Sequence, residues 1–251
     1  GNLQNEHNFC YSPEAVMKIR INGQLLLLML AEKLTQVGCR IVQANTDGLF
    51  VLLKKDSYQQ VNIICRNWEQ LTKLTLEEER FEAMYQYAIN DYIAVREGYK
   101  ETKNPDLIKT KGMFITKVLL GKGLSAKIIP EAIIKYFVDG IPVEQTIKEC
   151  EDIRKFLMSE KTGKQWHVEY MNEEQQRTNR FYASTNGGYL WKWKDNNGVP
   201  AYQNMLTASG VTLLNKFDNK PIEERKINYR YYLKEALKII EELQPRQLEL
   251  F

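Results

Sequence analysis

Residues 43–51 read Gln-Ala-Asn-Thr-Asp-Gly-Leu-Phe-Val and are bracketed by two short apolar runs, CRIV before them and LFVLL at 49–53. Asp-Gly between β-rich segments is a strong signal for a tight hairpin, because both residues tolerate a positive φ. We therefore expect strands over residues 40–44 and 49–53, with Asp47 at the tip. The hairpin signal alone makes Asp47 a turn residue, and the flanking segments decide whether its carboxylate has a further role.

The segments on both sides of the hairpin have helical patterns. Residues 12–38 begin with a Ser-Pro pair suited to a helix start and end at a glycine suited to a helix stop. Residues 56–74 keep apolar side chains three and four positions apart. Residues 81–95, rich in aromatic and β-branched side chains, predict one or two strands. This order, helix, hairpin, helix and strand, is that of a split β-α-β-β-α-β sheet without its first strand.

The second half of the chain differs in composition and in its predicted secondary structure. Residues 98–114 are polar and basic and are typical of a junction. Helices are expected over 130–140, 142–160 and 224–243, and a basic-aromatic segment at 175–194 is more typical of strands. The sequence therefore predicts the α+β class.

Composition sets wide limits. The chain has 251 residues, 43% hydrophobic and 27% charged, with a net charge of +3, which is ordinary for a globular protein and permits nucleic acid as a partner. Four widely spaced cysteines and two histidines argue against a structural zinc site and a disulfide framework. The run LLLLML at 25–30 is too short to cross a bilayer, so we expect a cytoplasmic protein without a membrane partner.

The hairpin also resembles a known motif. ANTDGLFV is similar to motif C in the palm of family B DNA polymerases, particularly those of bacteriophages, which usually reads Asp-Thr-Asp-Ser between apolar strands. Asp47 matches its second, essential aspartate, while Asn45 replaces the first and Gly48 the serine. The resemblance implies that Asp47 is a catalytic ligand of a two-Mg²⁺ site for nucleotidyl transfer, with the carbonyl of Thr46 as a further ligand.

Further segments match the same family in order. Residues 1–32 resemble the segment after the fingers motif Asn-Ser-x-Tyr-Gly, and INDYIAV stands where the family has Lys-x-Tyr, although Asn90 replaces the basic residue. KTKGMF matches the Lys-x-Lys-Gly element that holds the primer strand. The DNA-binding residues that the resemblance implies here are Tyr92, Lys109, Lys111 and Gly112. Without it, a solvated strand edge that deters aggregation is the favoured explanation of the alternating lysines.

A second DNA-binding patch is expected in RTNRFY, where Arg177, Arg180 and Tyr182 resemble thumb contacts to duplex DNA. An exposed strand face without a ligand explains the same pattern. The tyrosines at 229–232 and the tryptophans Trp166, Trp191 and Trp193 are expected in the core.

The last residues carry a separate pattern. QLELF, formed by Gln247, Leu248, Glu249, Leu250 and Phe251, resembles the bacterial sliding-clamp pentapeptide, usually Gln-Leu-Ser/Asp-Leu-Phe. A tail behind a helix-breaking proline suits this role, because it can offer its leucine and phenylalanine to an apolar pocket. The alternative is a tail folded onto the rest of the chain.

The resemblance implies an incomplete ferredoxin-like polymerase palm over residues 1–97, a junction over 98–120, a mostly helical thumb over 121–243 and a clamp-binding tail over 244–251. The exonuclease, the fingers and the strand with motif A, including another metal-binding aspartate, are expected on an N-terminal portion that precedes Gly1. Primer-template DNA, dNTP, that N-terminal portion, Mg²⁺ and a sliding clamp are the partners and cofactor that this reading implies.

Two other functions remain open. The first is a non-catalytic DNA- and clamp-binding module derived from a polymerase, which Asn45 and the absent first strand favour. The second is a nuclease or cyclase on a similar sheet, which ranks last because no second carboxylate or histidine cluster lies near the hairpin.

Overall fold

The computed structural model describes residues 2–45, 48–116, 125–206 and 209–243. The chain forms two compact units, residues 1–80 and residues 81–251. Every strand pairing in the described ranges is antiparallel. Helices and antiparallel sheets occur together, so the predicted α+β class is confirmed. None of the helices within these ranges is long and apolar enough to span a bilayer.

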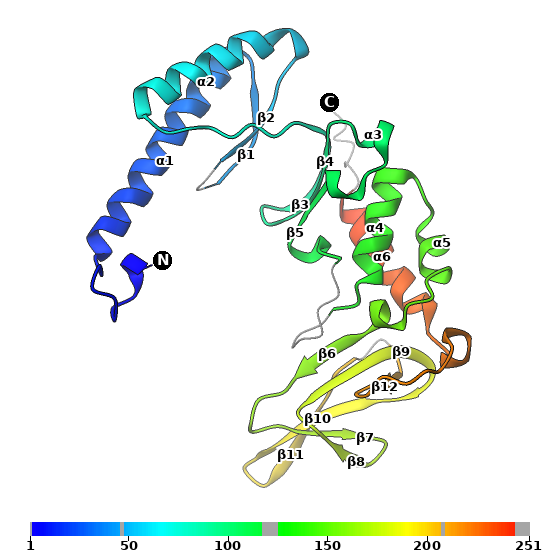
Figure 1. Ribbon diagram of the computed structural model, residues 1–251. Coiled ribbons are helices and arrows are strands. Elements are labelled where there is room, and N and C mark those ends of the chain that lie inside the picture. The colour runs from blue at the N-terminus through cyan, green and yellow to red at the C-terminus, as the bar shows by residue number, and fades with distance from the viewer. Residues whose placement is uncertain (1, 46–47, 117–124, 207–208, 244–251) are drawn as a thin grey trace, which may run out of the picture. The chain divides into compact units, whose positions relative to one another are not determined.

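The first unit is built from two helices and one hairpin (Figure 1). Its elements are α1 (Pro13–Gln36), β1 (Arg40–Ala44), β2 (Leu49–Leu52) and α2 (Tyr58–Thr72), with short 3₁₀ turns at Asn2–Gln4 and Lys55–Ser57. The predicted start of α1 is confirmed, because the Ser12 hydroxyl accepts a hydrogen bond from the N–H of Ala15 at 3.3 Å. The predicted hairpin and second helix are confirmed as well.

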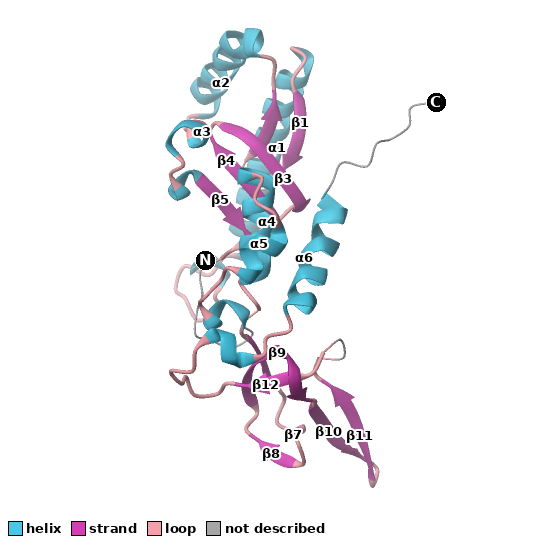
Figure 2. Cartoon of the chain, turned by 90° about the vertical axis from the view of Figure 1, so that its right-hand side faces the viewer, coloured by secondary structure: helices cyan, strands magenta, loops and turns pink. Residues whose placement is uncertain are grey.

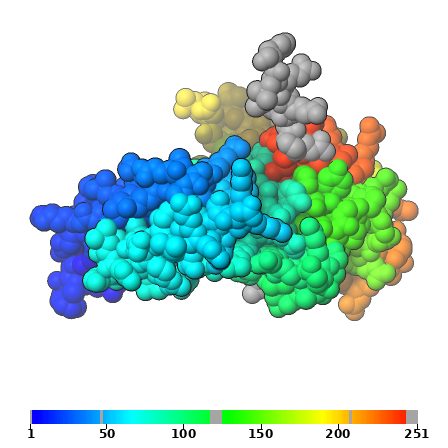
Figure 3. Space-filling model, turned by 90° about the horizontal axis from the view of Figure 1, so that it is seen from above, coloured from blue at the N-terminus to red at the C-terminus, as the bar shows by residue number. Residues whose placement is uncertain are grey.

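The core of this unit lies between the two helices and the hairpin. Its buried members are Leu30, Leu34, Cys39, Val61 and Trp68. Trp68 ties α2 to α1, because its indole N–H donates to the carbonyl of Leu26 at 2.8 Å. The blue and cyan surfaces of α1 and α2 adjoin in Figure 3, as this contact requires.

The second unit begins with a three-stranded sheet. The order is β3 (Phe81–Ala88), β4 (Asp91–Arg96) and β5 (Ile108–Lys111). The prediction of strands over residues 81–95 is confirmed, but the expectation that they share a sheet with the hairpin is not met among the described strands, where β1 and β2 pair only with each other. α3 (Tyr99–Thr102) and 3₁₀ turns at Pro105–Leu107 and Gly112–Phe114 flank β5.

Three helices pack with this sheet around the largest core. They are α4 (Ile128–Asp139), α5 (Val143–Lys148) and α6 (Tyr229–Leu243). Gly140 ends α4 with a φ of 71°, as predicted. The prediction of one helix over 142–160 is wrong beyond Lys148, because the Asp152 carboxylate accepts from the N–H and the guanidinium of Arg154. That local turn competes with helical hydrogen bonds.

Seven strands follow in the region expected to be a mostly helical thumb. They are β6 (Met158–Lys161), β7 (His167–Tyr170), β8 (Glu173–Gln175), β9 (Thr178–Gly188), β10 (Leu190–Asn196), β11 (Val199–Asn204) and β12 (Val211–Leu213). The expectation of a mostly helical thumb is therefore wrong for these strands, whereas the prediction of strands over residues 175–194 is confirmed by β9 and β10. The strands form two sheets, β12-β9-β6 and β11-β10-β7-β8 (Figure 2). Val168, Phe181, Leu190 and Val211 form the buried core between them.

The tryptophans of β10 differ from their predicted place in the core. Leu190 faces the core, so the alternation of the strand turns Trp191 and Trp193 to the other face. Trp191 is 36% exposed. The ring of Trp193 stacks on that of His167, with 4.4 Å between centroids.

Candidate nucleic-acid interface

Two segments that the sequence separates meet in the sheet β3-β4-β5. Tyr92 of β4 pairs directly with Lys111 of β5, and Ala94 pairs with Lys109. Side chains two positions apart in a strand point to the same face, so both lysines lie on the face that also carries Tyr92. The predicted strand-holding residues of the two motifs are thus neighbours.

This basic face, formed by Tyr92, Lys109, Lys111, Arg96 and Phe81, has a distinct chemistry. The Lys111 ammonium lies 5.9 Å from the centroid of the Tyr92 ring, and the Lys109 ammonium lies 6.0 Å from that of Phe81. Both distances are at the outer limit of a cation–π contact. Tyr92 is only 5% exposed, so its ring forms the floor beneath the lysine rather than a free stacking surface.

The opposite face of the same sheet anchors it. Ile93 and Val95 alternate with Tyr92, and both are buried. Tyr85 of β3 donates from its hydroxyl to the carbonyl of Phe137 in α4 at 2.9 Å, and Tyr87 donates to the carboxylate of Glu242 in α6 at 2.6 Å. That hydrogen bond raises the pKa of the Tyr87 phenol. The basic face therefore rests on a sheet fixed to two helices.

Gly112 occupies a position that only glycine fits. Its φ is +63°, and an added Cβ would lie 2.1 Å from Asp91 Oδ1 and 2.3 Å from the carbonyl oxygen of Asn90. Asp91 Oδ1 in turn accepts from the N–H of Met113 at 2.8 Å. This close approach holds the end of β5 against the β3–β4 turn, so Gly112 positions Lys111 through the backbone.

Sequence reasoning missed two members of the basic face. Arg96 lies on the same side of β4 as Tyr92, and its guanidinium donates to the carbonyl of Asp106 at 3.1 Å. Phe81 pairs with Arg96 across β3 and β4. The alternation in DYIAVR contained the signal for Arg96, because the residue lies four positions after Tyr92. Phe81 required the strand register, which no local pattern gives.

Such a face suits a phosphate backbone. Lysines two residues apart along a strand offer two ammonium groups, and phosphate contacts of this kind position a nucleic acid without reading its sequence. The aromatic floor limits the freedom of the lysine stems.

The second predicted patch is not brought together in the same way. Arg177 is exposed ahead of β9, whereas Arg180 is half-buried and donates to the carbonyl of Asn215 at 3.5 Å. Tyr182 is 3% exposed, and its hydroxyl donates to the carbonyl of Arg225 at 3.1 Å. The described structure gives Tyr182 a packing role instead of a DNA contact.

The predicted metal ligands Thr46 and Asp47 lie outside the described residues. The residues beside them close a turn: the N–H of Asn45 donates to the carbonyl of Gly48 at 3.0 Å, and the N–H of Gly48 donates to Asn45 Oδ1 at 2.9 Å. Among the described residues, no three His, Cys, Asp or Glu side chains gather as a metal site would require.

The predicted clamp-binding residues Gln247, Leu248, Leu250 and Phe251 also lie outside the described part of the chain.

Comparison with protein-family models and with curated protein sequences gives no match.

Proposed function

We propose that this chain is the C-terminal part of a DNA-directed DNA polymerase of the family B type. In this proposal it contributes one catalytic metal-binding aspartate, Asp47, and the surface that holds the primer-template. The observation that carries it is the basic face, because the two motifs that the resemblance links to the DNA, INDYIAV and KTKGMF, pair as adjacent strands with Tyr92 opposite Lys111.

The basic face would hold the primer strand through its phosphates. Lys109 and Lys111 supply the charge, while Tyr92 and Gly112 fix where that charge lies. Contacts of this kind fix the register of a duplex and carry no sequence preference, which is what a template-directed enzyme needs at the strand it extends.

The metal chemistry would use Asp47 together with a carboxylate on the N-terminal portion. A bound pair of Mg²⁺ ions would lower the pKa of the primer hydroxyl and stabilise charge on the reacting phosphate. Asp47 would hold one side of that site. Asn45 serves the turn through its side-chain oxygen, so it would position Asp47 rather than add charge.

The topology of the first unit supports the need for a second portion. In a split β-α-β arrangement an inserted strand separates the two parallel strands of each unit. The strand absent from the sequence pattern would lie between β2 and the strand after α2. In this proposal its absence would account for the two-stranded sheet of β1 and β2, an arrangement with little stability of its own. A portion with motif A would supply that strand and a second carboxylate.

Primer extension tests the catalytic proposal. The chain is mixed with an N-terminal portion that carries the exonuclease, fingers and motif A, and Mg²⁺-dependent incorporation of dNTP is measured. We expect synthesis only from the mixture, and its loss in Asp47→Ala. Asp56→Ala, which removes an exposed carboxylate of the same unit, is the matched control. Synthesis that survives Asp47→Ala would remove Asp47 from the metal site.

Salt-dependent DNA binding tests the role of the basic face independently. If Lys109 and Lys111 each neutralise one phosphate, each alanine variant should make the slope of log K against log salt shallower by about 0.9. Lys164→Ala, which removes an exposed lysine elsewhere in the second unit, should leave the slope unchanged. An unchanged slope in both lysine variants would exclude the face from DNA binding.

A non-catalytic DNA- and clamp-binding module is the second candidate. The use of Asn45 as a turn residue, where the family has a carboxylate, favours it. This candidate predicts binding to primer-template DNA with no synthesis from any added portion. Both candidates predict that removal of residues 247–251 abolishes clamp binding and leaves the affinity for DNA unchanged.

A further inference from the structure

The outer face of α6 carries a row of cations. Arg230, Lys234 and Lys238 follow one another at intervals of four residues, and all three are exposed. Residues four apart are neighbours on a helix surface, so the three side chains form one ridge. Within the described ranges, no carboxylate forms an ion pair with any of them.

Three lysines on other helices of this chain are paired with glutamates. Lys18, Lys135 and Lys148 each pair with the glutamate four residues earlier, at 2.7, 3.2 and 2.7 Å between the ammonium and carboxylate atoms. Like charges at that spacing destabilise a helix. The unpaired row on α6 is therefore a local cost within the isolated chain, and a bound anionic partner would remove it.

Two leucines lie beside this ridge. Tyr232, Ala236 and Ile240 are the buried residues of α6. Leu233 is partly buried at the edge of the same core, and Leu237 continues the apolar side of the helix into solvent. Leu237 is 47% exposed. A shallow, wide-open groove of about 490 Å³ follows this side of the helix and is lined by side chains of α6 alone: Arg230, Leu233, Lys234, Leu237, Lys238 and Glu241.

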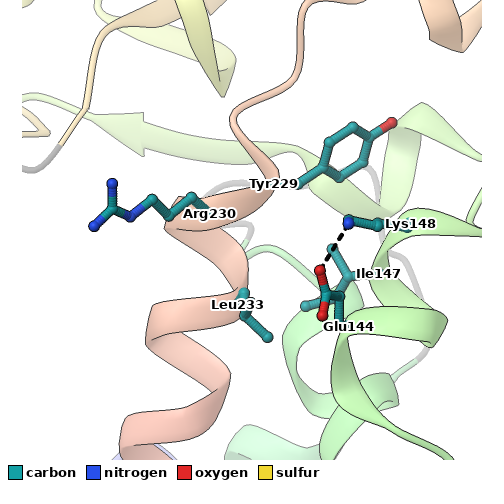
Figure 4. Close-up of a pocket in the computed structure, with 6 residues that line it drawn as sticks. All are labelled: Glu144, Ile147, Lys148, Tyr229, Arg230 and Leu233. Carbon is teal, nitrogen blue, oxygen red and sulfur yellow. Dashed lines mark ion pairs between the residues drawn. The ribbon is translucent and has the colours of Figure 1, made fainter.

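The groove continues into a pocket between α6 and α5. This pocket, of about 270 Å³, shares Arg230 and Leu233 with the groove. Figure 4 shows Leu233 and Tyr229 of α6 and Ile147 of α5 around it, with the Lys148–Glu144 ion pair on the α5 side. Together they make one surface that is apolar along its middle, mainly cationic along one side and closed by Glu241 at its far end.

We propose that this α6 groove binds an acidic amphipathic segment of a partner protein. A helix with leucines on one face would place them against Leu233 and Leu237 and the pocket, as in other helix-in-groove complexes. Glutamates or aspartates beside those leucines would face the cationic ridge. The ridge spans the length from Arg230 to Lys238, so more than two helical turns of the partner would be in contact.

The apolar middle of the groove favours a protein partner over DNA. A phosphate backbone is charged and hydrated along its length, and it would leave Leu237 against polar groups. An amphipathic peptide satisfies both the leucines and the cations. None of the residues of this groove belongs to the hairpin or to the basic face. A failure of the polymerase proposal would therefore leave the binding of an acidic peptide here unaffected.

Binding of designed peptides to the full chain tests this inference. One peptide of about 16 residues carries leucines at helical spacing flanked by glutamates, and a second has lysines in place of the glutamates. Fluorescence anisotropy measures both in the wild type and in the double variant Lys234→Glu/Lys238→Glu. Lys164→Glu/Lys216→Glu, which makes the same change in net charge at exposed sites elsewhere, is the matched control. Leu237→Asp tests the apolar part, and circular dichroism checks that each variant is folded.

We expect the acidic peptide alone to bind, and its affinity to fall by about tenfold or more in the ridge variant and in Leu237→Asp. The control variant should bind it like the wild type, apart from a small general effect of charge. Equal binding of the acidic and basic peptides, an equal loss in the control variant, or no binding at all would overturn the inference. A ridge variant that loses affinity for a short DNA duplex, but not for the acidic peptide, would overturn it in favour of DNA.

Discussion

The hydroxyl of Tyr232 gives the sharpest test of the second unit. This side chain is fully buried, and its oxygen accepts from the N–H of Ala183 in β9 at 2.8 Å while donating to the carbonyl of Phe156 at 2.9 Å. One oxygen thus joins α6, a sheet and the turn before β6. Burial also raises the pKa of this phenol, so it stays a donor at any ordinary pH.

Tyr232→Phe removes that oxygen and keeps the ring, which contacts Phe156 edge-on with 5.1 Å between centroids. The N–H of Ala183 and the carbonyl of Phe156 then lose their partner in places that water does not reach. Each buried group left unsatisfied costs about 1–3 kcal/mol, so for these two groups we expect a loss of about 2–6 kcal/mol in the free energy of unfolding. With an m-value of about 2 kcal/mol per molar urea, the unfolding midpoint falls by about 1–3 M.

Tyr231→Phe is the matched control for this measurement. Among the described residues, the hydroxyl of Tyr231 has one hydrogen bond, a weak one to the sulfur of Met158 at 3.8 Å, so its removal should change stability by less than about 0.5 kcal/mol. Urea denaturation followed by circular dichroism and by tryptophan fluorescence compares the two variants. A Tyr232→Phe variant as stable as the control would refute the view that this hydroxyl ties the unit together.

Three further predictions follow from single contacts. Gly112→Ala should weaken DNA binding, measured by anisotropy with a labelled duplex, because the new methyl group collides with Asp91; unchanged affinity would mean that this turn does not position the basic face. The buried Arg225 guanidinium holds the pKa of the Asp218 carboxyl below its usual value, so this pair stabilises the fold above about pH 4, the ordinary aspartate value, and its contribution disappears as the pH falls through the lower folded value. Asp218→Asn should accordingly flatten the acid side of a stability–pH curve, and a curve identical to the wild type would contradict the pairing. Trp68→Phe should destabilise the first unit by about 1–3 kcal/mol in urea denaturation, because it removes the hydrogen bond to the carbonyl of Leu26 and part of a packed ring. Unchanged stability would show that this hydrogen bond contributes nothing to the packing of α2 on α1.

Local patterns predicted the elements well where each element depends on its own sequence. The periodicity of α1 and α6, together with the Ser12 cap of α1, predicted both helices, because helical hydrogen bonds join residues four apart. The predicted start of α6 at residue 224 is five residues too early, because Ile222–Arg225 form a 3₁₀ turn instead. The Asp-Gly hairpin was predicted because its tight turn also depends on residues that are adjacent in the sequence. The region 142–160 failed because the Asp152 side chain offers the backbone a competing turn, and periodicity takes no account of such a bond.

No local sequence pattern could predict which side chains of β9 are buried. Phe181 packs into the core between the two sheets, and Tyr182, next to it, packs into the core with α6. Because both faces of the strand are covered, the usual alternation of inside and outside is lost. Arg177 stays exposed only because it lies before the strand begins.

The sequence by itself determined α1, α2, α4 and α6, the hairpin and the order of basic and aromatic motifs, since each depends on residues within a few positions of one another. The tertiary structure alone decided which of those motifs meet. Tyr92 lies beside Lys111 because β4 pairs with β5 across an intervening loop, and Tyr182 is inside because a second layer covers its face. Long-range pairing and layer packing set these positions, and no short window of sequence contains them.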